Sequence, residues 1–520
     1  MSESVGEGML PLDKDIRNEI LSATGNIVIS ASAGTGKTHT TIQRIIKDAK
    51  ENKNFQTFAA VTFTRKAAKE IINRLGPNKA DGFVGTNDNF ICLDIIQPFM
   101  YDVYGVDFKK DLKQDFNEEN EITTFNEGIE VVRKTQLICK YDDKKKNFAF
   151  QLALDILKKS HSARRYLKAK YYRVYIDEYQ DSDVDMHNFF MYLCDHLNIP
   201  LFIVGDEKQS IYGWRGAYST GFTSLFGKQT FVKFELWHNF RSNIVIQNYS
   251  NIFMKNVRKH FQQTEFEDEV IAYKYSQESD AIDYIKKWIK TTERCAFLNF
   301  SNRNAEKWSK LLNEVDLPFV FIPGSPLDFS NLESEHIWIA RAIAHYSIQD
   351  KYSEYDFMDE IPMPEAFQLL DIRKMLGSIR DSENEIQKYI ENCMKFYEYL
   401  GYNEDLDKIK KEISILFKVV NDEKYIPTYN QDNYNLTAGT IHSSKGLEFS
   451  QVIINAQDYD LTNEDILYLH YVAITRPEDR LLIIGQNDVL NIYENNIHTA
   501  IDLTKSLGID IDIDKVIKII

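Results

Sequence analysis

The sequence has few of the features that mark secreted, membrane or metal-cluster proteins. No apolar run approaches the roughly 20 residues that span a bilayer, and the acidic start MSESVGEGML lacks the apolar stretch of a signal peptide. The chain has five cysteines and no CxxC pair, so no zinc or iron-sulfur motif is visible. We therefore expect a cytoplasmic protein with reduced thiols and no membrane contact. The cysteines are Cys92, Cys139, Cys194, Cys295 and Cys393.

Positive charge is also scarce. The 62 Lys and Arg residues are outnumbered by 78 Asp and Glu, which gives a net charge of -16. Because phosphate binding needs clustered Lys and Arg, any nucleic-acid contact is expected in a local groove. With 43% hydrophobic residues in 520, the chain should fold as three or four globular modules.

Short β-branched and aromatic runs alternate with helical periodicity, a pattern typical of parallel sheets covered by helices. Two sets of such runs predict two doubly wound α/β sheets. The first set is 26–31, 58–64, 172–178, 200–206 and 230–236, and the second is 296–301, 319–322, 436–442, 451–456 and 481–486. Each set is interrupted by a charged, strand-poor stretch that predicts a mainly helical insertion. No repeat of fixed period and no long Pro, Gly or Ser linker is present.

The clearest local motif is ASAGTGKT, between a predicted strand and a predicted helix. Glycines let main-chain N–H groups close around phosphate oxygens, Lys37 would reach the β and γ phosphates, and Thr38 would bind Mg²⁺. Ala31 replaces the first glycine of the generic pattern, and a Gly-rich turn without nucleotide is the alternative. The predicted nucleotide-binding residues are Ala33, Gly34, Thr35, Gly36, Lys37 and Thr38.

A second strand, YRVYIDE, ends in Asp177 and Glu178, at the edge where open parallel sheets bind ligands. An acidic residue there can hold Mg²⁺ while its neighbour orients or deprotonates the attacking water. A solvated acidic loop is the alternative. Together with the phosphate loop, the pair predicts hydrolysis of ATP.

The run YIDEYQDSD resembles the DExQD box of the UvrD, PcrA and RecB group of superfamily 1A helicases. Six further stretches follow that family's order: VTFTRKAAKE, GTNDNF, GDEKQSIYGWRGA, NFRS, TIHSSKGLEF and YVAITR. The resemblance implies two RecA-like domains, 1A and 2A, that bind ATP and walk along one DNA strand, normally 3′ to 5′. Domain 1A is expected at 1–100 and 169–236 with an insertion at 101–168, and domain 2A at 237–327 and 435–520 with a reduced insertion at 328–434.

The resemblance also implies roles for single residues. Gln209 would sense the γ phosphate, and Arg241 and Arg476 would reach it from domain 2A, where positive charge accelerates phosphoryl transfer. Glu448 takes the ribose-contacting position, and Phe240 stands where the family stacks a tyrosine on the base. Surface salt bridges for the arginines and core packing for Phe240 are the alternatives.

A track for single-stranded DNA needs aromatic faces for bases and polar groups for the backbone. By resemblance, Phe63, Tyr212 and Trp214 would stack on bases or act as a wedge. The GWRG context of Trp214 is loop-like, with core burial as the alternative. Residues expected to contact the backbone or sugars are Thr62, Thr64, Thr440, His442 and Asn302.

The sequence also departs from the family. Ile16 aligns with the adenine-reading glutamine, so use of other NTPs or dNTPs beside ATP is expected. Asp88 stands where a DNA-contacting histidine is common, so that contact is not transferred. The chain ends soon after YVAITR, without room for the nuclease domain of RecB relatives. Its compact form also resembles the helicase subunit of the Gabija anti-phage system, which works beside a separate nuclease subunit.

Two functional hypotheses follow. In the first, the chain is an ATP-dependent, DNA-stimulated helicase or translocase that acts on single-stranded DNA and duplex–single-strand junctions, in anti-phage defence or DNA repair. In the second, it is an ATPase sensor of DNA ends that activates a partner nuclease without processive unwinding. A transporter ATPase is excluded, because the sequence has no membrane segment and no LSGGQ-like signature.

Overall fold

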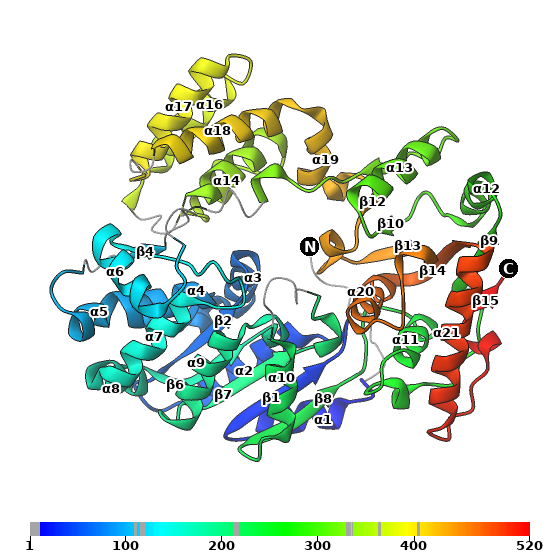
Figure 1. Ribbon diagram of the computed structural model, residues 1–520, viewed down its shortest axis with the longest axis horizontal. Helices are drawn as coiled ribbons and strands as arrows, with labels where there is room; N and C mark the ends of the chain where they lie inside the picture. The colour runs from blue at the N-terminus through cyan, green and yellow to red at the C-terminus, as the bar shows by residue number, and fades with distance from the viewer. Residues whose placement is uncertain are drawn as a thin grey trace. The chain divides into compact units, whose positions relative to one another are not determined.

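The computed structural model describes residues 11–108, 112–114, 121–211, 218–328, 334, 336–361, 366–402 and 406–520 (Figure 1). The chain divides into two compact units. The first unit consists of Met1–Val270, Tyr459–Asp479 and Asn491–Lys518. The second consists of Ile271–Asp458, Arg480–Leu490 and Ile519–Ile520.

The first unit is built on a six-stranded sheet of order β3-β2-β6-β7-β1-β8, and its neighbouring strands pair in parallel. Parallel strands need crossover connections, which the helices between them supply. The strands are β1 (Asn26–Ala31), β2 (Thr57–Thr62), β3 (Phe83–Thr86), β6 (Tyr171–Ile176), β7 (Leu201–Gly205) and β8 (Phe231–Leu236).

Alternate residues of each strand face opposite layers of helices, as a period of two requires. Ile27 and Ile29 of β1 join one core, and Val28 between them joins the other. The first core includes residues of α1 (Lys14–Ser22), α2 (Lys37–Glu51) and α3 (Arg65–Leu75). The second core includes residues of α4 (Asn87–Ile91), α7 (Phe148–Lys159), α8 (His161–Lys170), α9 (Val184–Asp195) and α10 (Ser219–Ser224).

The insertion predicted in the first sheet domain is mainly helical. A π-helical turn, η2 (Cys92–Ile96), and α5 (Gln97–Tyr104) lead into it. It then contains β4 (Lys113–Gln114), α6 (Phe125–Thr135) and β5 (Leu137–Ile138) before α7 and α8 return the chain to β6. The first unit also contains α11 (Ile244–Ile252), α20 (Glu464–Ile474) and most of α21 (Asn487–Lys505).

The second sheet has seven strands in the order β11-β12-β10-β13-β14-β9-β15, and the pairs around β10 and β12 are parallel. Helices α12 (Glu278–Trp288) and α13 (Asn302–Asn313) pack on one core with its strands. The strands are β9 (Val270–Tyr275), β10 (Cys295–Asn299), β11 (Val320–Phe321), β12 (Leu436–Thr440), β13 (Phe449–Asn455), β14 (Pro477–Gln486) and β15 (Lys518–Ile519).

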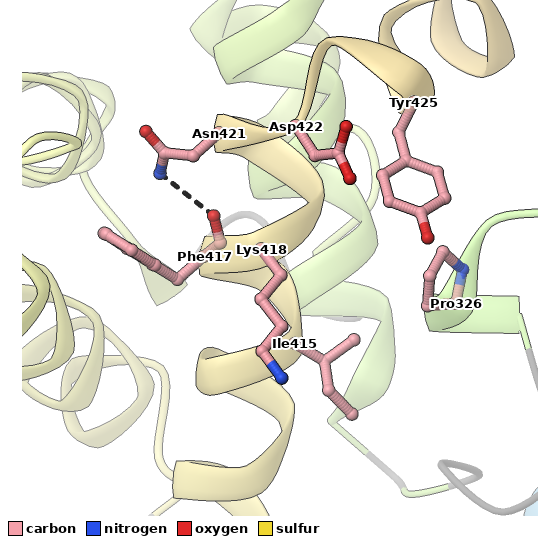
Figure 2. Close-up of a pocket in the computed structure, with 7 residues that line it drawn as sticks. All are labelled: Pro326, Ile415, Phe417, Lys418, Asn421, Asp422 and Tyr425. Carbon is pink, nitrogen blue, oxygen red and sulfur yellow. Dashed lines mark hydrogen bonds between the residues drawn. The ribbon is translucent and has the colours of Figure 1, made fainter.

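The insertion of the second unit is a helical bundle with its own core. An open depression of about 510 Å³ lies on it between α18 and the segment near Pro326 (Figure 2). In its wall the Asn421 amide donates to the Phe417 carbonyl over 2.9 Å. The helices are α14 (Ile337–Ile348), α15 (Glu354–Met358), α16 (Leu369–Arg380), α17 (Ile386–Tyr399), α18 (Leu406–Asn421) and α19 (Ile426–Tyr429).

The predicted fold class is confirmed: two parallel-sheet α/β domains, each with a mainly helical insertion. The division into six parts at the stated residues stays a prediction. Sequence patterns missed the short strand β3 and the strands β9 and β15 of the second sheet. Among the described residues, no helix combines the length and apolar character that crossing a membrane requires.

Candidate nucleotide site

The phosphate loop follows β1 and ends where α2 begins. Gly34 and Gly36 adopt left-handed φ angles of 71° and 74°, which glycine adopts without steric cost. A Cβ at Gly34 would lie 2.0 Å from the Asn239 Oδ1 atom. Glycine is therefore required at this position for its backbone angle and for the close approach of residues 239–241.

The rest of the loop is held rigid by burial and by one short-range bond. Ala33 and Thr35 are buried, and the Thr35 hydroxyl donates to the Ser32 carbonyl over 2.8 Å. Such a fixed loop keeps its main-chain N–H groups oriented before an anion arrives. The geometry fits a phosphate cradle.

Lys37 stands at the first position of α2 with its ammonium group buried. Its Nζ atom has no hydrogen-bond partner among the described residues, and the nearest carboxylate oxygen of Glu178 lies 3.5 Å away. A buried ammonium without hydrogen bonds is costly, so the site favours an incoming anion. The phosphates of a nucleotide supply such oxygens.

Asp177 follows β6 and lies beside Thr38 at the same edge of the sheet. The Thr38 hydroxyl donates to the Asp177 carboxylate over 3.1 Å. Burial and the neighbouring Glu178 carboxylate raise the pKa of Asp177, and although Lys37 opposes them, the net result is a pKa of about 6. Hydroxyl and carboxylate oxygens are the ligands that Mg²⁺ prefers, so this pair fits the predicted metal position.

Glu178 adopts a left-handed backbone conformation with a φ of 54°, which is strained for a residue with a side chain. Its N–H donates to the Asp177 carboxylate over 2.9 Å, and its own carboxylate accepts from the Gln180 amide. These bonds place the Asp177 and Glu178 carboxylates in different environments. Different environments are what a metal ligand, here Asp177, and a general base, here Glu178, require.

Gln209 lies in the short helix η5 (Glu207–Gln209) after β7 and is buried. Its side-chain amide donates to the Asp206 carboxylate over 2.6 Å. The predicted γ-phosphate sensor is therefore held by a carboxylate of its own loop.

The two predicted arginines meet at one residue, Thr475. The guanidinium of Arg241 donates to the Thr475 carbonyl over 3.1 Å, and that of Arg476 donates to the Thr475 hydroxyl over 3.2 Å. The N–H of Phe240 donates to the Gly34 carbonyl over 2.9 Å. The segment after β8 and the end of α20 thus come together with the phosphate loop within the first unit.

Arg17 is a residue that the sequence reasoning missed. Its guanidinium pairs with the buried Asp13 at 2.7 Å, donates to the Thr35 carbonyl at 3.0 Å and lies 4.9 Å from the centre of the Phe240 ring. Asp13 also accepts from the main-chain N–H groups of Trp237 and His238. Helix α1 therefore joins the phosphate loop to the segment after β8.

The same contacts bear on the predicted base site. Phe240 has 56% of its surface exposed, so it is not a core residue, but Arg17 covers one face of its ring. A base would stack on the other face or displace Arg17. Ile16, aligned with the family's adenine-reading glutamine, instead packs partly buried against the sheet core. The sequence feature that could have pointed to Arg17 was its spacing of four residues from Asp13, which allows the two side chains to pair.

Replacing Arg17 with alanine should raise the KM for ATP about tenfold, because a charged hydrogen bond to the phosphate loop is worth about 1.5–3 kcal/mol. Steady-state ATPase titrations would measure this. Asn18→Ala, an exposed position on the same helix, is the matched control. A KM within twofold of wild type would contradict the role of Arg17.

The predicted DNA residues of the first unit differ in their surroundings. Thr62 is buried at the end of β2, and Phe63 packs partly buried against the core. The Thr64 hydroxyl caps α3 by accepting from the Ala67 N–H over 3.1 Å. Tyr212 and Trp214 lie outside the described residues. Their contacts with DNA stay predictions.

The remaining predicted residues belong to the second unit. Thr440 ends β12, and its Cα pairs in register with Asn299, which ends β10. Asn302 begins α13 just after β10 and is exposed, and His442 lies in the turn after β12. These three residues therefore lie at the carboxyl edge of one parallel sheet. Glu448 is exposed just before β13.

Two family models match the chain. An AAA domain model matches residues 16–215, and a UvrD-like helicase C-terminal domain model matches residues 339–488. The first spans the phosphate loop and the acidic pair, and the second ends after Arg476. The two matches together cover most of the elements described above.

Several characterised proteins are similar to this chain. The Gabija protein GajB of Bacillus cereus is 38% identical over 92% of this chain and 96% of its own length. The PcrA DNA helicase of Staphylococcus epidermidis is 21% identical over 89% of this chain and 82% of its own. A probable DNA helicase II homologue of Rickettsia conorii is 26% identical over 48% of this chain and 46% of its own. The chain belongs to the UvrD-like family of helicase ATPases, in the group that includes the Gabija protein GajB.

Proposed function

We propose that this protein is an ATP-dependent DNA translocase that moves 3′ to 5′ on single-stranded DNA, which stimulates its ATP hydrolysis. The observation that carries the proposal is the convergence of Arg241 and Arg476 at Thr475, next to the phosphate loop. Arg241 and Arg476 are distant in sequence from the phosphate loop, so hydrolysis depends on the positions of the two segments that carry them. A motor needs this dependence to couple chemistry to movement.

The residues of the site divide the work of hydrolysis. Lys37 and the loop N–H groups bind the β and γ phosphates, and Glu178 accepts a proton from the attacking water. Arg241 and Arg476 compensate the negative charge that grows on the transferring oxygens. Gln209, held by Asp206 after β7, would sense the γ phosphate.

Thr38 and Asp177 would hold Mg²⁺. When bound, the ion neutralises charge on the β and γ phosphate oxygens. Burial and Glu178 raise the pKa of Asp177 more than Lys37 lowers it, so a bound cation would stabilise the charged carboxylate. With Ile16 packed partly buried against the core, the base would be held mainly by stacking on Phe240, which supports use of other NTPs or dNTPs beside ATP.

Each unit contributes residues that would contact the DNA strand. Phe63, Tyr212 and Trp214 would stack on bases, as expected of proteins that bind single strands without sequence preference. Thr64, Asn302, Thr440 and His442 would contact the backbone. The position of the last three at the carboxyl edge of parallel strands supports this, since such edges are where open α/β sheets bind ligands.

The similarity to GajB supports a place in anti-phage defence beside a separate nuclease subunit. The nuclease would cut DNA, and this chain would move on it or sense its ends. Duplex–single-strand junctions are the expected substrates, because cleavage and unwinding both produce them.

The proposal is tested by ATPase assays of the purified chain with and without a single-stranded oligonucleotide. We expect stimulation of at least about tenfold, and strand displacement from a 3′-tailed duplex but not from a 5′-tailed one. Turnover indifferent to single-stranded DNA would refute the motor. Stimulation without any displacement would favour a sensor of DNA ends that activates its partner nuclease.

A further inference from the structure

A buried charge cluster lies between the acidic loop and helix α20, in residues to which no role has yet been given. Asp206, Lys208 and Tyr471 form it, and all three are buried within the first unit. Helix α20 packs against η5, the short helix that contains Lys208 and Gln209. Arg476 follows α20 by two residues.

Asp206 is the centre of the cluster. Its carboxylate accepts from the Gln209 amide over 2.6 Å and forms an ion pair with Lys208 at 2.6 Å. Its main-chain N–H donates to the side-chain Oε1 atom of Gln180 over 2.9 Å, and the side-chain N–H of Gln180 donates to the Glu178 carboxylate. A continuous chain of bonds therefore runs from the proposed general base to Lys208.

Lys208 keeps its charge although it is buried. Burial lowers the pKa of Lys208, but Asp206, Tyr471 and Glu207 together raise it by more, so the ammonium stays protonated. Its Nζ atom lies 5.8 Å from the centre of the Tyr471 ring, a cation–π distance. This is a direct contact between the loop of Gln209 and helix α20.

Tyr471 links the cluster to the phosphate loop. Burial raises the pKa of its hydroxyl, and the main chain of Ala33 and the side chain of Ser32, which lie beside that hydroxyl, lower it. The next residue of α20, Val472, accepts the Arg476 Nε–H at its carbonyl over 2.9 Å. The position of the Tyr471 ring therefore fixes the position of the end of α20, which Arg476 follows in the chain.

We propose that Lys208 and Tyr471 are positioning residues for hydrolysis, which hold Gln209 and Arg476 in register with the phosphate loop. The proposal rests on the proposed function, since it gives this contact a part in the same reaction. Neither residue touches the reacting atoms. Each acts through a neighbour: Lys208 through Asp206 on Gln209, and Tyr471 through α20 on Arg476.

Tyr471→Phe is the sharpest test, because it keeps the ring and removes only the hydroxyl that lies beside Ser32 and Ala33. Removing this polar group from a buried position next to the phosphate loop should lower kcat about tenfold, with the KM for ATP unchanged within about twofold. Tyr468→Phe is the matched control, since its hydroxyl bonds to Glu464 over 2.8 Å on the same helix, and it should leave kcat unchanged.

Lys208→Met removes the charge while keeping the length of the side chain, and it should produce a similar loss. Because Lys208 and the Tyr471 ring meet in one cation–π contact, a Lys208→Met, Tyr471→Leu double variant should be about as slow as the worse of its two single variants. Losses that multiply would overturn the shared contact. Affinity for ADP with aluminium fluoride, a mimic of the transferring phosphoryl group, should fall about tenfold in Tyr471→Phe while affinity for ADP alone stays constant.

The outcomes separate the two proposals. Wild-type turnover that ignores single-stranded DNA would overturn the proposed function, and the test of Tyr471 would still be read in basal turnover. Normal DNA stimulation together with a wild-type kcat in Tyr471→Phe would overturn the positioning role alone. A rise in KM at unchanged kcat would also overturn it, because it would make the contact one of ground-state binding.

Discussion

Replacing Lys37 with alanine should lower kcat for ATP hydrolysis by about 10³-fold, since removing one preorganised charge donor at a phosphoryl or oxyanion site costs about that much. The buried ammonium has no hydrogen-bond partner among the described residues, so the phosphate oxygens are its natural partners. Without it, Glu178 also loses the ammonium group that lies 3.5 Å from its carboxylate. Phosphate release at saturating ATP and single-stranded DNA measures the effect.

Lys50→Ala is the control for this substitution, because Lys50 is an exposed lysine in the last turn of the same helix. It should retain wild-type turnover. DNA binding without nucleotide should survive in Lys37→Ala, which shows that the chain is folded. If Lys37→Ala kept more than a tenth of wild-type turnover, the phosphate loop would not be the catalytic nucleotide site.

The sequence predicted the central strands well because buried parallel strands are continuous apolar runs. Strand β1 was predicted at its observed residues, Asn26–Ala31. Strand β3 was missed because it has only four residues, all partly exposed, so its sequence carries little apolar signal. Strand β15 has two residues at the chain end, and such short pairs form only through tertiary contacts.

The positions of the candidate site residues were predictable where one short motif contains both the strand that places a residue and the residue type that the chemistry needs. The phosphate loop, Asp177 and Glu178 are each fixed by a strand and the loop after it, so local sequence placed them at one edge. Contacts between distant segments were not predictable in this way. That Arg241 and Arg476 meet at Thr475, and that Arg17 lies on Phe240, depends on how three separate segments pack.

One physical feature joins these distant contacts. The carbonyl of Gly34 accepts from the N–H of Phe240, and Ala33 and Ser32 lie beside the Tyr471 hydroxyl. The phosphate loop therefore contacts the segment of Arg241 through Gly34 and the helix before Arg476 through Ala33 and Ser32. A movement of the loop on phosphate release would therefore change the positions of both arginines together. A motor requires such a coupling, in which nucleotide state and the positions of distant segments depend on each other.

Replacing Arg476 with alanine should lower kcat by about 10³-fold or more, the range known for arginines that stabilise phosphoryl transfer. The KM for ATP should change less than about threefold, because the guanidinium acts on charge that develops in the transition state. Arg476→Lys should not restore activity, since a lysine cannot form the two-pronged contacts that Arg476 makes with Val472 and Thr475.

Arg165→Ala, an exposed arginine on α8, is the charge-matched control and should behave as wild type. Because Arg476 is buried, the affinity of the variant for single-stranded DNA and its thermal unfolding must be measured beside turnover. Arg241→Ala should give a loss of the same order, and the double variant should be little worse than Arg476→Ala, because both guanidinium groups bond to Thr475 and act on the same phosphate. If the losses multiplied in the double variant, the two arginines would act independently. If Arg476→Lys had a wild-type kcat, positive charge alone would suffice at this position.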